Sequence, residues 1–94
     1  HWANPVWHLY VVRSINRDEV QKRFQIAEIE TLIHYPIPPH MQQAYADLDI
    51  TADMLPLATK MADEVLSLPI GPQMSQLEIR STIKEARNAL SLYL

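Results

Sequence analysis

Hydrophobic positions along this chain of 94 residues follow two periods, one typical of strands and one typical of helices. Residues 6–13 are rich in β-branched and aromatic side chains, which predicts a strand that is apolar and covered on both faces. A second apolar run at residues 31–35 predicts another strand. Residues 67–70 predict a short extended piece, which Gly71 and Pro72 end.

The helical period is clearest where it follows a capping pattern. Asn16 precedes an apolar stripe of Val20, Phe24 and Ala27, and Glu19 stands where a side chain can reach back to the Asn16 N–H. This pattern predicts a capped helix that ends near residue 28.

Two further helices are predicted in the second half of the chain. Pro56 occupies a favoured first helical position and predicts a helix to about residue 66. Before it, the spacing of residues 40–47 predicts about two helical turns. Ser75 and Glu78 repeat the capping pattern ahead of a stripe that runs to the end of the chain: Ile79, Ile83, Ala86 and Leu90. The order β-α-β-(short α)-α-β-α predicts an α+β fold in one domain over residues 1–94, a short mixed or antiparallel sheet with helices packed mainly on one face.

Composition argues against several classes of protein. The net charge of −3 leaves no basic surface for a phosphate backbone, so nucleic acid is not an expected partner. There is no cysteine for a thiolate zinc site, and a single glycine rules out Gly-rich phosphate loops and nucleophile elbows. With no recognisable signal peptide or membrane-length apolar run, we expect a cytoplasmic protein. Because the chain begins at His1, we also expect it to be a piece of something longer.

Residues 31–40 form the most distinctive segment, because an apolar run ends in His34 and Tyr35 and three prolines then precede His40. Prolines hold the backbone extended, so these side chains are presented rigidly. Such a segment is either a functional tip or an ordinary corner of the fold.

No complete catalytic set is recognisable from the residues themselves. A metal site on the two histidines of this segment would need a third donor, and the spacing of the candidates does not require one: His8, Asp47 and Asp49. We therefore predict no metal site and expect His8 to be a core histidine within its strand. The lysines fall on or near polar helix faces, without the desolvated setting of a Schiff-base lysine: Lys22, Lys60 and Lys84.

Three separated segments, in the right order and spacing, resemble the C-terminal region of DegT/StrS-type sugar aminotransferases. They are residues 7–13, residues 16–18 and the run Thr31-Leu32-Ile33-His34-Tyr35-Pro36-Ile37-Pro38-Pro39-His40. Residues 43–48, residues 62–69 and the closing helix continue the match, so the resemblance covers nearly the whole chain. Residues 33–40 are most similar to members that aminate C3 of dTDP-linked keto-6-deoxysugars.

The resemblance implies a pyridoxal-phosphate enzyme with the aspartate-aminotransferase fold, usually a homodimer. Such an enzyme transfers an amino group from glutamate to a keto group of a nucleotide-linked deoxysugar. A large N-terminal domain would hold the cofactor and the Schiff-base lysine. This chain is similar to the C-terminal small domain alone, which helps to close the sugar site, so we expect it to hold no cofactor and to be inactive by itself.

The family also implies roles for three residues. His34 matches the histidine that faces the bound sugar, where it would hydrogen-bond the sugar or its phosphates rather than abstract a proton. Tyr35 and His40 belong to the same motif and are expected to shape the loop or line the rim of the substrate site. Members commonly have glycine where this chain has Glu28 and Glu30, so either the turn differs here or a strained positive φ is tolerated.

A function of a different class stays open, namely a free-standing β-α-β module that binds or senses an effector without catalysis. Such a module needs a mostly polar exterior. A domain of a larger enzyme instead exposes a contiguous apolar patch. The candidates for that patch are Trp2, Trp7, Tyr93 and Leu94.

Overall fold

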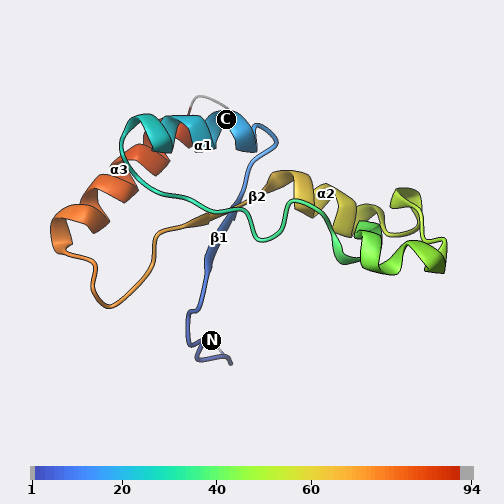
Figure 1. Cartoon of the computed structure of the whole chain (residues 1–94). Coiled ribbons are helices and arrows are strands. Elements are labelled where there is room, and N and C mark those ends of the chain that lie inside the picture. Colours follow the sequence, from blue (N-terminus) through green and yellow to red (C-terminus); the bar gives the residue numbers. More distant parts are fainter. Residues whose placement is uncertain (1, 92–94) are drawn as a thin grey trace.

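The computed structural model describes residues 2–91, which form an α+β unit around a two-stranded antiparallel sheet. Helices α1 and α3 lie side by side over one end of the sheet, and α2 with the short 3₁₀ turns extends away from it as an arm (Figure 1). The predicted α+β class is confirmed, and of the two predicted sheet types, mixed or antiparallel, the structure has the antiparallel one. Helices α1 and α3 pack over the sheet as predicted, whereas α2 does not. The elements are β1 (Tyr10–Arg13), α1 (Arg17–Ile26), 3₁₀ turns at Pro39–Met41, Gln43–Leu48 and Ala52–Met54, α2 (Pro56–Glu64), β2 (Val65–Leu68) and α3 (Gln76–Ser91).

The core lies between the sheet and the pair of helices. Val20 and Phe24 of α1 are buried one turn apart, which confirms two positions of the predicted stripe, while the third, Ala27, is half-buried at the C-cap. Leu66 and Leu68 of β2 point to the same face because side chains alternate along a strand. Ala89 of α3 completes the buried cluster.

Both predicted strands of the N-terminal half are shorter than expected. Strand β1 begins at Tyr10, and Tyr10 and Val11 are exposed, so the prediction of a strand covered on both faces is wrong for this chain. Residues 31–35 contribute one bridge, in which Leu32 and Ser67 exchange backbone hydrogen bonds of 3.1 and 2.7 Å. No further bridge follows along this segment of the described chain, and the prolines at 36, 38 and 39 have no backbone N–H with which to extend the pairing.

The two predicted capping boxes have different outcomes. At α1 the Ser14 hydroxyl accepts the Asn16 N–H at 3.1 Å, so the donor that Glu19 was expected to satisfy is already taken. At α3 the box is formed, since Ser75 N–H donates to the Glu78 carboxylate at 2.7 Å and Glu78 N–H donates to the Ser75 hydroxyl at 3.2 Å. Hydrogen bonds from the Ser75 hydroxyl and backbone hold the pKa of Glu78 below its ordinary value.

Helix α2 passes directly into strand β2, two residues earlier than predicted. Its last carbonyls are satisfied from the turn after β1: Ser14 N–H donates to the Glu64 oxygen at 2.9 Å. The Arg17 guanidinium donates to the carbonyl oxygens of Ala62 and Val65, each at 3.2 Å. A cation at a helix C-terminus also interacts favourably with the helix dipole, so this contact fixes where the helix ends and the strand begins.

Helix α1 ends in a left-handed residue, as the family's preference for glycine at this turn suggests. Glu28 has φ of 58°, and its N–H donates to the Gln25 oxygen at 3.0 Å while Ile29 N–H donates to the Phe24 oxygen at 2.9 Å. These two bonds and the packing of Ile29 against the core make a Schellman motif with glutamate in place of glycine. Of the two predicted outcomes, the structure therefore has the tolerated positive φ, at Glu28.

Large apolar side chains are left on the surface of this elongated unit. Its radius of gyration is 15.7 Å and its extents are 48 × 32 × 25 Å, whereas a compact domain of this length has a radius of gyration of about 12 Å. Trp2 and Trp7 are exposed as expected, and the other two candidates for an exposed patch, Tyr93 and Leu94, lie outside the described residues. The arm adds further exposed side chains: Met41, Tyr45, Leu48, Met54, Leu55 and Leu57.

The left-handed turn predicts a stabilising substitution. Glu28→Gly should raise the free energy of unfolding by about 0.5–1 kcal/mol, because a left-handed conformation costs a non-glycine residue about 1–2 kcal/mol and part of the gain is lost to unfolded-chain entropy. Urea unfolding of both chains measures the difference. Glu30→Gly is the matched control: no positive φ is found at Glu30, so this change should stabilise nothing. Equal effects at the two positions would contradict the assignment of strain to Glu28.

Candidate functional site

His34 is held against the buried strand by a single hydrogen bond. Its Nδ1 lies 2.9 Å from the hydroxyl oxygen of Ser67, which is buried at the middle of β2. The Leu32 bridge brings the two residues together, since it fixes the chain two residues before His34 to the backbone of Ser67 itself. His34 is half-buried, so one edge of its ring stays within reach of a ligand.

Tyr35 lies beside His34 but points toward solvent. The two rings meet edge to face with their centroids 5.5 Å apart, and the peptide bond between the two residues is cis. The Tyr35 side chain is exposed. The structure therefore brings together two of the three predicted site residues.

His40 is placed differently, because it is buried against the arm. Its Nε2 lies 3.2 Å from the Thr59 hydroxyl oxygen, and that hydroxyl is within hydrogen-bonding distance of the carbonyls of Ala52 (3.1 Å) and Leu55 (3.2 Å). Since the hydroxyl has one proton to donate, it accepts from His40. His40 thus ties the end of the proline segment to α2, a placement suited to shaping the loop rather than to meeting a ligand.

A cavity of about 370 Å³ surrounds the exposed side of the His34–Ser67 pair. Four further polar residues, none of them predicted to belong to the site, also line it: His8, Glu30, Thr31 and Gln73. His8 is exposed because the strand begins only at Tyr10, so the expectation of a core histidine is wrong. These residues come from distant parts of the sequence, and the pairing of Tyr10 with Leu68 and the bridge between Leu32 and Ser67 bring their segments together.

Neither a metal site nor an activated lysine is built from the side chains described. Among residues 2–91, no three His, Cys, Asp or Glu side chains lie close enough together to hold a metal ion. Each lysine is exposed, with Lys22 near Glu19 at 2.8 Å and Lys60 near Glu64 at 3.8 Å. In the same part of the chain, every helix lacks the length and apolar composition needed to cross a bilayer.

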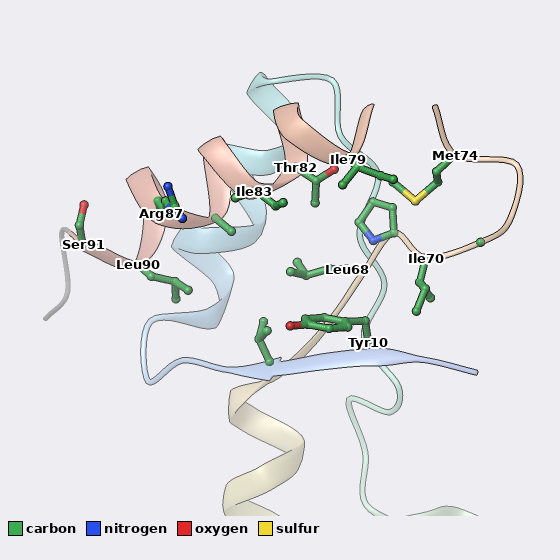
Figure 2. Close-up of a pocket in the computed structure, with 14 residues that line it drawn as sticks. Tyr10, Leu68, Ile70, Met74, Ile79, Thr82, Ile83, Arg87, Leu90 and Ser91 are labelled. Carbon is green, nitrogen blue, oxygen red and sulfur yellow. The ribbon is translucent and has the colours of Figure 1, made fainter. Parts of the chain in front are cut away.

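Figure 2 shows a second hollow, an open apolar groove of about 750 Å³ between α3 and the sheet. One wall is the sheet face and the other is the apolar stripe predicted for the last helix, with a loop at one end. The sheet contributes Tyr10, Val12 and Leu68. Helix α3 contributes Ile79, Ile83 and Leu90, and the loop contributes Ile70 and Met74. Helix α3 reaches the core through the small residues Ala86 and Ala89, and the side chains of Ile79, Ile83 and Leu90 face the groove.

Comparison with known proteins decides the family. Residues 1–87, nearly the whole chain, match the DegT/DnrJ/EryC1/StrS aminotransferase family. The chain belongs to this family. Its resemblance to these enzymes, first indicated by the segment around His34, is confirmed.

Relatives in the family are much longer than this chain. Erythromycin biosynthesis sensory transduction protein EryC1 of Saccharopolyspora erythraea is 51% identical over 75 residues, which are 80% of this chain and 20% of that protein. The dTDP-3-amino-3,4,6-trideoxy-alpha-D-glucose transaminase of Streptomyces venezuelae is 42% identical over 85 residues, 90% of this chain and 22% of that protein. The chain thus spans about one fifth of the length of the curated relatives that it matches.

Solved structures of the family contain the same arrangement. S. venezuelae DesV, crystallised in complex with a ketimine intermediate, has a TM-score of 0.87 and 41% identity over 90% of this chain and 23% of that chain. A DegT DnrJ EryC1 StrS aminotransferase from Brucella abortus has a TM-score of 0.76 and 30% identity, covering 85% of this chain and 21% of its own. The fold described here therefore occurs within a far longer chain of the DegT/DnrJ/EryC1/StrS family.

The contact between His40 and Thr59 predicts a loss of stability. Thr59→Val should lower the free energy of unfolding by about 1–3 kcal/mol, because the buried His40 N–H loses its acceptor and the Ala52 carbonyl loses its donor. Thermal and urea unfolding measure the change. Thr51→Val is the control, since Thr51 is exposed and its side chain makes no cap hydrogen bond. An equal and small effect of both changes would show that His40 is not held in this way.

Proposed function

We propose that this chain is the C-terminal small domain of a pyridoxal-phosphate-dependent transaminase that acts on a nucleotide-linked deoxysugar, with glutamate as amino donor. The observation that carries the proposal is the family match, which runs through the His34 segment and includes relatives named as dTDP-aminosugar transaminases. In this proposal the enzyme is a homodimer, and the domain supplies one wall of the sugar site.

The residues described do not fit the cofactor itself. Pyridoxal phosphate is bound covalently by a lysine whose amine is activated by a desolvated or charged pocket. Lys22, Lys60 and Lys84 are exposed, and they line neither the groove nor the cavity around His34. We therefore assign the cofactor and its lysine to a large N-terminal domain and expect the 94 residues to have no transaminase activity alone.

His34 is the residue through which this domain would contact substrate. A half-buried imidazole beside a cavity offers a directional hydrogen bond to a sugar hydroxyl or phosphate oxygen. Tyr35, edge-on to His34 and exposed, would line the rim, and His40 would hold the loop in shape through Thr59. In this arrangement the domain binds and orients the sugar, and proton transfer belongs to other residues.

The apolar groove and the elongated shape support docking to the rest of such an enzyme. A two-stranded sheet is marginally stable unless another layer covers it. Here a groove stays open between the sheet face and α3. About four fifths of the length of each matched relative lies outside the matched segment, and this additional chain could fill the groove. We assign the groove to the large domain.

The alternative is a free-standing module that binds or regulates. The names of two relatives favour it: the sensory transduction protein of S. erythraea and a pleiotropic regulatory protein of Geobacillus stearothermophilus. The exposed apolar groove and arm argue against a self-contained module, which would need a polar exterior.

A chimera tests the proposed domain. Replacing the matched segment of the S. venezuelae transaminase by this chain should retain turnover on that enzyme's own substrate. In the chimera, His34→Ala should raise KM for the nucleotide sugar about tenfold, the worth of one good hydrogen bond, with a smaller effect on kcat. Leu77→Ala on the exposed side of α3 is the control. A folded, cofactor-loaded chimera without turnover would contradict the proposal and favour the module.

The groove makes a separate prediction about docking. In the isolated chain, Ile83→Glu should change stability little, because Ile83 is 48% exposed. In the chimera, the same change should lower the melting temperature markedly, since a charge would then be buried against the large domain. Ile26→Glu, at an 83% exposed site outside the groove, should have no such effect in either protein. A chimera that tolerates Ile83→Glu would show that the groove is not covered.

A further inference from the structure

Ser67 is a buried hydroxyl with one partner. It lies at the centre of β2, and its backbone N–H and carbonyl both bond to Leu32. Within residues 2–91 the only group that its hydroxyl contacts is His34 Nδ1, at 2.9 Å. The proposed function uses His34 but gives no role to Ser67.

The single contact determines where the imidazole proton resides. If His34 Nδ1 carried the proton and donated it, the Ser67 O–H would have no acceptor among the protein groups of residues 2–91, a loss that costs a buried hydroxyl about 1–3 kcal/mol. If Ser67 donates instead, both groups are satisfied. The favoured arrangement is therefore a hydroxyl that donates to an unprotonated Nδ1, which leaves the ring proton on Nε2.

The other ring nitrogen is then an unused donor. In the described part of the chain, no protein group bonds His34 Nε2, while the ring borders the cavity of about 370 Å³. An Nε2–H group recognises an oxygen with a free lone pair, such as a sugar hydroxyl or a phosphate oxygen. It has no lone pair with which to take a proton.

We propose that Ser67 is a positioning residue that fixes His34 as the Nε2–H tautomer and so makes it a hydrogen-bond donor to the ligand. This inference rests on the proposed function for the identity of the ligand, but the tautomer is a property of the chain alone. Ser67 suits this role because its backbone N–H and carbonyl both bond Leu32, which holds its Cα in place. Its hydroxyl therefore presents one fixed direction to the ring.

Long-range ¹H–¹⁵N correlation spectra of the labelled chain, at a pH where imidazole is neutral, test the proposal. We expect His34 Nδ1 to resonate far downfield, as an unprotonated nitrogen does, and Nε2 upfield. In Ser67→Ala both nitrogens should shift toward the averaged values of the exposed His8. Ser67→Thr retains the hydroxyl and should restore the original values. In His34→Gln the ring-nitrogen signals of His34 should disappear, which identifies them in the spectrum of the native chain.

Thr59→Val is the matched control, because it removes the hydroxyl that faces His40 and should move only the His40 signals. A protonated Nδ1 in the native chain would overturn the proposal, and so would His34 shifts unchanged by Ser67→Ala. If the alanine variant does not fold, Ser67→Cys replaces it: the weak thiol donor should give intermediate shifts, and shifts identical to those of Ser67→Thr would overturn the proposal. No sugar is present in these spectra, so their outcome is independent of turnover by the chimera.

Discussion

Burial of strand β2 on both sides is the constraint on which the rest of the described structure depends. All four of its residues are buried, although the strand belongs to a sheet of only two. Leu66 and Leu68 pack under α1 and α3, while Ser67 on the other face bonds His34. The same four residues therefore anchor both the hydrophobic core and the candidate site, so the position of His34 follows from packing rather than from a loop.

The features that could be predicted from the sequence are the local ones. Three of them follow from spacing within one or two helical turns. They are the buried pair Val20 and Phe24, the capping box of Ser75 and Glu78, and the first residue of α2. The box at Asn16 failed for an equally local reason, because the hydroxyl of Ser14 competes for the same N–H. The sequence pattern shows which side chains could accept a given N–H, but it does not show which of two such acceptors lies closer in the folded chain.

The remaining features depend on contacts between distant segments. Sequence reasoning selected His34 and missed Ser67, since a serine within an apolar run shows no sign of the residue it will face. His8 was expected to be buried because the run from residue 6 to residue 13 has the composition of a covered strand. Residues 2–91 contain no second layer that covers this apolar segment, and the open groove beside Tyr10 shows the same lack of cover. This uncovered face thus explains why His8, Tyr10 and Val11 are exposed although they were predicted to be covered.

The direct passage from α2 into β2 has a mechanical consequence. No loop separates Glu64 from Val65, and Ser14 and Arg17 clamp the junction by hydrogen bonds to its carbonyls. A stiff helix joined without slack to a strand behaves as a lever, with the protruding arm as its long end. A tilt of the arm would therefore move the strand that carries Ser67, three residues past the junction, and with it the imidazole bonded to that serine.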